Sequence, residues 1–180
     1  MKTFAIAALA LLLAAASPAL AADPENTLVL ETVNGKVVLE LRPDLAPRHV
    51  ARIKELTRKG FYDGTPFHRV IDGFMAQGGD PTGTGTGGSG TKIPAEFSGE
   101  NFVRGVVGMA RSASPDSADS QFFIMLGSSP SLDGRYTVLG RVVEGMDVVD
   151  RIKKGDSREN GLVTKPDKLV RMRVAADVKP

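Results

Sequence analysis

Short segments rich in β-branched and apolar residues recur along the whole sequence, and this pattern restricts the chain to a mainly β architecture. The first two segments, 27–33 and 36–41, are joined at Asn34-Gly35, which is a strong signal for a tight hairpin. Seven further strand candidates lie at 66–71, 74–78, 95–98, 105–110, 121–126, 137–143 and 169–175. Many short strands with few helices are typical of an antiparallel sheet that closes into a barrel.

Two helices are predicted between these strands. Pro47 suits the first turn of a helix, Asp44 or a neighbour is a candidate cap, and Gly60 suits the end. The apolar positions of this helix follow helical spacing at Ala46, Val50, Ile53 and Leu56. A second, short helix is predicted from 146 to about 154, and the polar, turn-rich segment 155–167 is predicted to be a loop.

The first 21 residues have the composition of a secretory signal peptide. Lys2 precedes an apolar run from 4 to 16, and an Ala-x-Ala site follows at 19–21. The run is shorter than the roughly 20 apolar residues that span a bilayer, so an anchor helix is the less favoured alternative. We therefore predict cleavage after Ala21, a single domain at 22–180, and a periplasmic or secreted location.

Composition excludes several classes of function. The formal net charge is only +2, which favours neither nucleic acid nor a membrane surface as a partner. The chain has no cysteine and only two histidines, His49 and His68, so it lacks the ligands of a zinc site and cannot form disulfides. His49 is predicted on the exposed or flanking side of the first helix, and His68 is predicted to pack inward.

The segment 67–80 is the best candidate for a binding site. It places Arg69 and Gln77 among large apolar side chains, including Phe74 and Met75, and several glycines. Alternation along extended strands predicts an apolar patch with a guanidinium and an amide at its edge. Taken alone, Arg69 is better interpreted as a structural ion-pair partner. We find no activated nucleophile or general base, and the glycine-rich run 83–88 lacks the following helix that a dinucleotide site requires.

Several motifs in order resemble those of the cyclophilin-type peptidyl-prolyl cis-trans isomerases. Besides 67–80, they are Gly60-Phe61-Tyr62-Asp63-Gly64-Thr65, Gly108-Met109-Ala110-Arg111, Ser120-Gln121-Phe122-Phe123-Ile124 and the run from Leu132 to Val142. The similarity extends from about Leu28 to Val174, which is nearly the whole predicted mature chain. It implies a closed eight-stranded antiparallel barrel capped by two α-helices.

The resemblance also implies an enzyme that accelerates X–Pro isomerisation, with proline-containing polypeptides as partners and no cofactor or metal. Arg69 is then expected to donate to the proline nitrogen, and Gln77 to orient a substrate amide or Arg69. Phe122 is expected in the core. The expected substrate-binding residues are Phe74, Met75, Ala110, Arg111, Phe123, Leu132 and Tyr136.

The chain departs from the best-known animal members at two positions. Ser131 stands where they have Trp, and Tyr136 where they have His. The resemblance therefore implies weak binding of cyclosporin-type macrocycles. We expect a monomeric isomerase that assists the folding of exported proteins; the alternative is a binding module or holdase chaperone for proline segments with little turnover.

Overall fold

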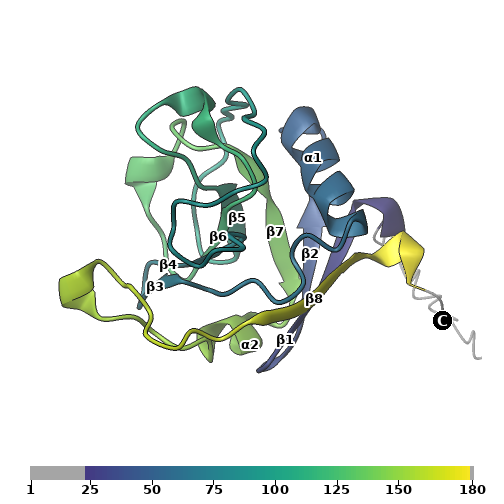
Figure 1. The fold of residues 1–180 in the computed structure, drawn as a ribbon. Coiled ribbons are helices and arrows are strands. Elements are labelled where there is room, and N and C mark those ends of the chain that lie inside the picture. Colours follow the sequence, from purple (N-terminus) through teal and green to yellow (C-terminus); the bar gives the residue numbers. More distant parts are fainter. Residues whose placement is uncertain (1–22, 179–180) are drawn as a thin grey trace, which may run out of the picture.

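The computed structural model describes residues 23–178, which form an eight-stranded antiparallel sheet and two α-helices (Figure 1). The elements are β1 (Thr27–Thr32), β2 (Gly35–Leu41), α1 (Pro47–Arg58), β3 (Arg69–Ile71), β4 (Met75–Gly78), β5 (Val106–Met109), β6 (Phe122–Met125), β7 (Val138–Glu144), α2 (Met146–Asp150) and β8 (Leu169–Val174).

The sheet is strongly curled, with strand order β3-β4-β6-β5-β7-β2-β1-β8. Its outer strands are β3 and β8, and the segments just before them meet. Pro66 forms an isolated bridge with Lys168, and the Phe67 N–H donates to the Asp167 carbonyl at 2.9 Å. The apolar core, which includes Leu28, Leu39 and Phe122, fills the inside of this curl. The predicted mainly β architecture with two helices is confirmed.

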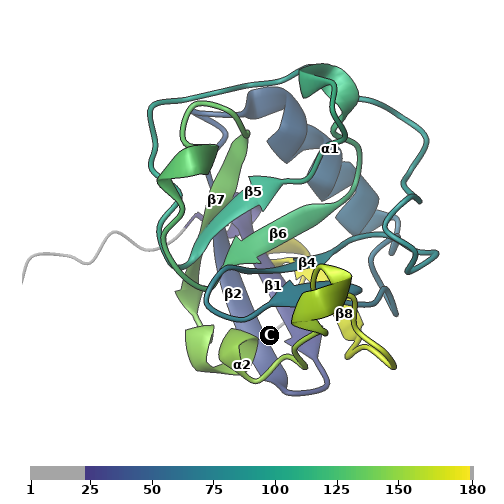
Figure 2. The same cartoon turned by 90° about the vertical axis from the view of Figure 1, so that its left-hand side faces the viewer.

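The two helices lie at opposite ends of the sheet (Figures 1 and 2). The buried stripe of α1 includes Val50, Ile53 and Leu56, as the helical spacing predicted. Helix α2 ends at Asp150, about one turn earlier than predicted. The reason is that the next backbone N–H groups leave the helical pattern: the Lys153 N–H donates to the Asp167 carboxylate at 2.9 Å.

The N-terminus of α1 corrects two predictions. Asp44 does not cap the helix, because its carboxylate pairs with Arg42 at 2.7 Å. Instead, Glu96 accepts from the backbone N–H groups of Arg48 at 3.2 Å and His49 at 3.0 Å. His49 is fully buried rather than exposed, and its Nδ1 lies 2.6 Å from Glu96. Burial lowers the pKa of His49, and Glu96 opposes this shift only in part.

The predicted strand at 95–98 is wrong. This segment makes only an isolated bridge, between Phe97 and Thr137. Side chains occupy the N–H groups that a strand would use for pairing: Ala95 donates to the Asp116 carboxylate at 2.8 Å, and Glu96 donates to the Thr137 hydroxyl at 3.0 Å.

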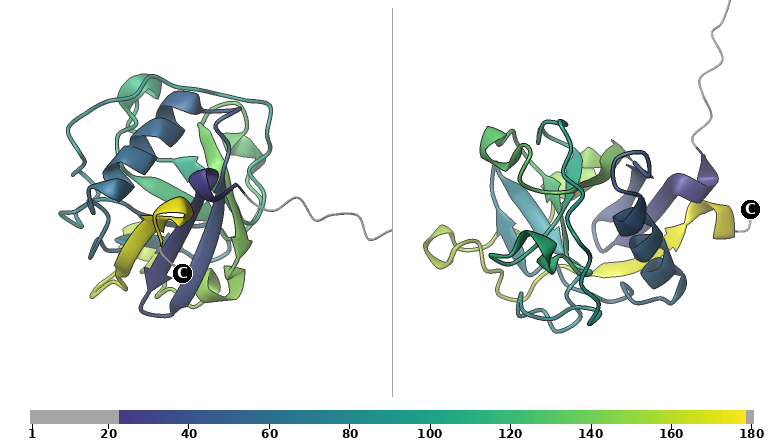
Figure 3. Two further views of the ribbon diagram at one scale, coloured as in Figure 1. Left: turned by 90° about the vertical axis from the view of Figure 1, so that its right-hand side faces the viewer. Right: turned by 90° about the horizontal axis from the view of Figure 1, so that it is seen from above.

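The first hairpin forms as predicted, with a small shift in its turn. Thr32 pairs with Gly35, so Val33 and Asn34 are the turn residues, and Gly35 has a φ of 135°. The 3₁₀ turns Pro24–Asn26 and Ala175–Asp177 lie side by side, near the two ends of the described chain (Figure 3). The predicted signal peptide, 1–21, lies outside the described residues. Within 23–178, neither helix is long and apolar enough to cross a membrane.

Candidate active site

The β3–β4 hairpin builds one side of the candidate site. Its register places Arg69 opposite Gln77, and Met75 shares the face of Gln77 because side chains alternate along a strand. Gln77 in turn pairs with Phe123 of β6. Three neighbouring positions on three strands therefore bring a guanidinium, an amide and an aromatic ring to one place.

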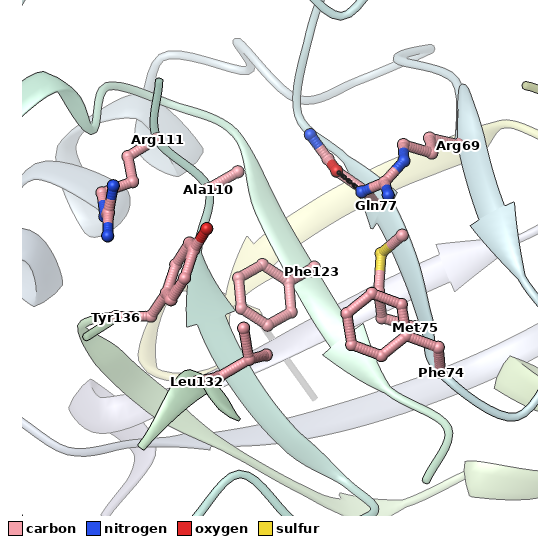
Figure 4. Close-up of a pocket in the computed structure, with 9 residues that line it drawn as sticks. All are labelled: Arg69, Phe74, Met75, Gln77, Ala110, Arg111, Phe123, Leu132 and Tyr136. Carbon is pink, nitrogen blue, oxygen red and sulfur yellow. Dashed lines mark hydrogen bonds between the residues drawn. The ribbon is translucent and has the colours of Figure 1, made fainter. Parts of the chain in front are cut away.

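All nine residues that the sequence singled out line a single pocket (Figure 4). They come from the β3–β4 hairpin, from β6, from the segment after β5 and from the loop before β7: Arg69, Phe74, Met75, Gln77, Ala110, Arg111, Phe123, Leu132 and Tyr136. The apolar members surround the centre, while Arg69 and Gln77 lie together at one edge (Figure 4).

Aromatic rings make much of the apolar wall of this pocket, and two of them, Phe123 and Tyr136, contact each other. Phe123 stacks on Phe102 with ring centroids 5.7 Å apart and planes inclined by 27°. Tyr136 meets the edge of Phe123 at 5.8 Å. The adjacent Phe122 belongs to the main core cluster instead, in line with the expectation for two successive strand residues. Phe102 lies behind this wall, and no sequence pattern indicates its role.

Arg69 is held by neutral groups. Its Nη1 donates to Gln77 Oε1 at 3.2 Å, its Nε donates to the Asn160 carbonyl at 2.9 Å, and its Nη2 donates to Asn160 Oδ1 at 2.9 Å. None of the ion pairs found between residues 23 and 178 includes Arg69, which removes its interpretation as a structural ion-pair partner. Burial lowers the pKa of Arg69, but an arginine starts high enough to remain charged near neutral pH.

Gln77 is held in turn by Gln121. The Gln77 Nε2 donates to Gln121 Oε1 at 2.9 Å, and the Gln121 Nε2 donates to the carbonyls of Gly85 at 3.0 Å and Gly87 at 2.8 Å. Because two carbonyls can only accept, they fix the orientation of the Gln121 amide, and Gln121 fixes that of Gln77. The Gln77 oxygen is therefore directed at Arg69.

A buried carboxylate shapes the glycine-rich loop that supports Gln121. Asp80 accepts from the backbone N–H groups of Thr82 at 2.8 Å, Gly85 at 2.7 Å and Gly87 at 3.1 Å, and from the Thr82 hydroxyl at 2.8 Å. Burial raises the pKa of Asp80, but these hydrogen bonds outweigh that effect and the net shift is downward. The loop is thus an ordered edge of the site and not a phosphate-binding element.

Arg111 lies at the rim of the pocket opposite Arg69 and Gln77 (Figure 4). Its guanidinium lies 4.4 Å from the centroid of the Tyr136 ring, and it donates to the Arg135 carbonyl at 3.0 Å. These contacts hold the Tyr136 ring against Phe123. The Arg111 side chain therefore supports the pocket wall.

Among the described residues, no Ser, His, Asp or Glu side chain lines this pocket. Neither His49 nor His68 lines the pocket, and both are buried elsewhere. In the part of the chain that the structure describes, no group of three or more His, Asp or Glu side chains is placed to hold a metal ion. The arrangement can bind an apolar ring and direct a cationic donor at its edge.

Comparisons with known proteins show what this chain is similar to. The family model of cyclophilin-type peptidyl-prolyl cis-trans isomerases matches residues 27–174. A probable peptidyl-prolyl cis-trans isomerase of Brucella suis is 56% identical, over 97% of this chain and 95% of its own. A cyclophilin from Hirschia baltica has a TM-score of 0.78 and 32% identity, covering 88% of this chain and 77% of its own.

A second solved structure, from Cryptosporidium parvum, has a TM-score of 0.75 and 29% identity, covering 82% of this chain and 98% of its own. It is a cyclophilin-type peptidyl-prolyl cis-trans isomerase crystallised in the presence of the dipeptide Ala-Pro.

Proposed function

We propose that this chain, which belongs to the cyclophilin-type peptidyl-prolyl cis-trans isomerases, uses Arg69 to accelerate X–Pro isomerisation while exported proteins fold. The isomerase activity follows from the family. The residue roles and the cellular setting are the substance of the proposal, and the observation that carries the roles is the Arg69 guanidinium at the edge of an apolar pocket.

Isomerisation of an X–Pro bond needs a hydrogen-bond donor in the active site more than it needs a general base. Rotation about a peptide bond loses amide resonance and has a barrier of about 18–20 kcal/mol. In the twisted state the proline nitrogen becomes pyramidal and gains a lone pair, which the planar ground state lacks. A hydrogen bond to that nitrogen therefore stabilises the transition state selectively. An acceleration of about 10⁵ requires only about 7 kcal/mol of such stabilisation.

In this proposal, separate residues perform these tasks. Phe74, Met75, Phe123 and Leu132 hold the proline ring. Arg69 then donates to the imide nitrogen, and Gln77 fixes the direction of that donor through its 3.2 Å hydrogen bond. The backbone at Ala110 and Arg111 pairs with the residue before proline. The Ala-Pro dipeptide used with the Cryptosporidium parvum relative is a minimal ligand of the chemistry that such a pocket suits.

The N-terminal sequence supports an exported setting. Residues 1–21 combine a charged start, an apolar run and an Ala-x-Ala site, so we propose a mature protein beginning at Ala22 in the periplasm or outside the cell. Intact mass of the protein recovered from the periplasmic fraction or medium tests this. A mass that retains residues 1–21 contradicts the exported setting and leaves the isomerase activity untouched.

The catalytic role is tested with Arg69→Ala in an isomerisation assay on an X–Pro peptide. Removing one transition-state donor typically lowers kcat by about 10²–10³-fold, and we expect a loss in that range. Arg141→Ala is the matched control, because Arg141 is an exposed arginine paired with Glu40 on the outer surface. Equal rates for Arg69→Ala and the control would favour a binding module or holdase in which this guanidinium does not act.

A further inference from the structure

Asn160 accepts two hydrogen bonds from the guanidinium of Arg69, the proposed catalytic group. Its backbone carbonyl accepts from Arg69 Nε, and its side-chain Oδ1 accepts from Arg69 Nη2, both at 2.9 Å. A guanidinium presents a rigid fork of parallel N–H groups, and a pair of oxygens on one residue matches that fork. This contact joins positions 91 residues apart in the sequence.

Hydrogen bonds attach the segment that carries Asn160 to β3. The Val70 N–H donates to the Gly161 carbonyl at 2.8 Å, and the Gly161 N–H donates to the Asp156 carbonyl at 2.8 Å. A Cβ on Gly161 would lie 2.4 Å from Ile71 Cγ1, so only glycine allows this close approach. Asn160 is therefore presented from a rigid support rather than from a free loop.

Asn160 also has an uncommon backbone conformation, with a φ of 53°. Non-glycine residues seldom adopt the left-handed region, although asparagine tolerates it better than most. The segment holds this conformation while presenting both Asn160 oxygens to Arg69.

The contact leaves part of Arg69 available for substrate. A guanidinium has five N–H donors, and among the described residues three hydrogen bonds engage it, which leaves two donors. All three acceptors are neutral, so the positive charge of Arg69 is not cancelled by a carboxylate. Without the hydrogen bonds to Asn160, the flexible Arg69 side chain would lose conformational freedom each time it donated to the imide nitrogen.

We propose that Asn160 is a positioning residue that holds Arg69 in its reactive orientation through the neutral side-chain acceptor, an inference that rests on the proposed catalytic role of Arg69. Asn160 acts through Arg69 and not on the substrate. Its removal should slow turnover while leaving the apolar proline pocket, and with it KM, nearly unchanged.

Asn160→Gly is the sharpest test, because glycine accepts a φ of 53° and keeps the backbone carbonyl while it removes Oδ1. Lys165→Gly is the matched control, since Lys165 is the other non-glycine residue with positive φ (54°) in the described chain and makes no hydrogen bond to Arg69. We expect kcat to fall by about 10- to 100-fold in Asn160→Gly, the scale of a small misplacement of a catalytic group. The control should retain the wild-type rate.

A double variant separates positioning from general structural damage. If Asn160 works only through Arg69, adding Asn160→Gly to Arg69→Ala causes no further loss of rate. The inference is overturned if Asn160→Gly retains the wild-type kcat, if it raises KM instead, or if it slows the Arg69→Ala protein as much as the wild type. A fully active Arg69→Ala protein would overturn the proposed function itself, and the inference with it.

Discussion

Gly108 of β5 leaves the space for two stacked rings, Phe123 in the pocket wall and Phe102 behind it. A Cβ at this position would lie 2.4 Å from Phe123 Cζ and 2.6 Å from Phe102 Cε1. Carbon atoms in contact prefer a separation of about 3.5–4.0 Å, so in Gly108→Ala both rings must move by about 1 Å. The φ of Gly108 lies outside the left-handed region, and the cost is therefore steric rather than conformational.

The expected penalty is that of an overpacked core, about 1–3 kcal/mol in the free energy of unfolding. Phe123 also forms part of the pocket wall, so its displacement should narrow the space that we propose for the proline ring. If about 1–2 kcal/mol of binding is lost in this way, KM rises roughly 5- to 30-fold. The atoms nearest to the new methyl group belong to Phe123 and Phe102 and not to Arg69, so kcat should change much less.

Urea denaturation and steady-state isomerisation kinetics measure both effects. Gly99→Ala is the matched control, because Gly99 has no atom within 4 Å of an added Cβ and no left-handed φ. The control should stay within about 0.5 kcal/mol of the wild type. A Gly108→Ala protein with unchanged stability and unchanged KM would refute the proposed packing of the pocket wall.

Three other outcomes are expected. The rate of isomerisation should be flat between about pH 6 and 8, because Arg69 stays charged and no general base takes part; a bell-shaped profile of kcat/KM would contradict this. The net downward shift in the pKa of Asp80 means that its ionised carboxylate stabilises the fold above about pH 4, and that this contribution is lost as the pH falls through the folded-state pKa. Asp80→Asn should therefore cost about 1–3 kcal/mol at pH 7 and weaken the acid dependence of urea denaturation, whereas an unchanged acid dependence would exclude Asp80 as its source. Calorimetry should show weak binding of a cyclosporin-type macrocycle, since the exposed Ser131 offers no large contact surface, and tight binding would be evidence against this expectation.

Local pattern was sufficient for most of the fold. The β1–β2 hairpin and the buried stripe of α1 follow from alternation and helical spacing, which are properties of short segments. The errors have a common cause, since each depends on a partner distant in sequence. Glu96 caps α1 from 47 residues away and draws His49 into the interior, and side chains of Asp116 and Thr137 prevent a strand at 95–98.

The residues of the site also divide into those that a local pattern or a family resemblance predicts and those that depend on a contact distant in sequence. Alternation within β3 and β4 places Arg69 beside Gln77, and the resemblance to a family supplied the remaining wall residues. No sequence pattern points to Asn160, because its contact with Arg69 spans 91 positions and its loop has no periodicity. The Asn160-Gly161 pair was the only local signal, and it indicates a left-handed turn rather than a role in a site.

The most direct test of the central claim is the rate at which a bound X–Pro peptide exchanges between cis and trans on the protein, measured by NMR exchange spectroscopy at saturating peptide. With Arg69→Ala, we expect the peptide still to occupy the pocket of Phe74, Met75 and Phe123, and the on-protein exchange rate to fall by at least about 100-fold. An exchange rate equal to that of the wild type, at equal occupancy, would show that the guanidinium does not stabilise the twisted imide.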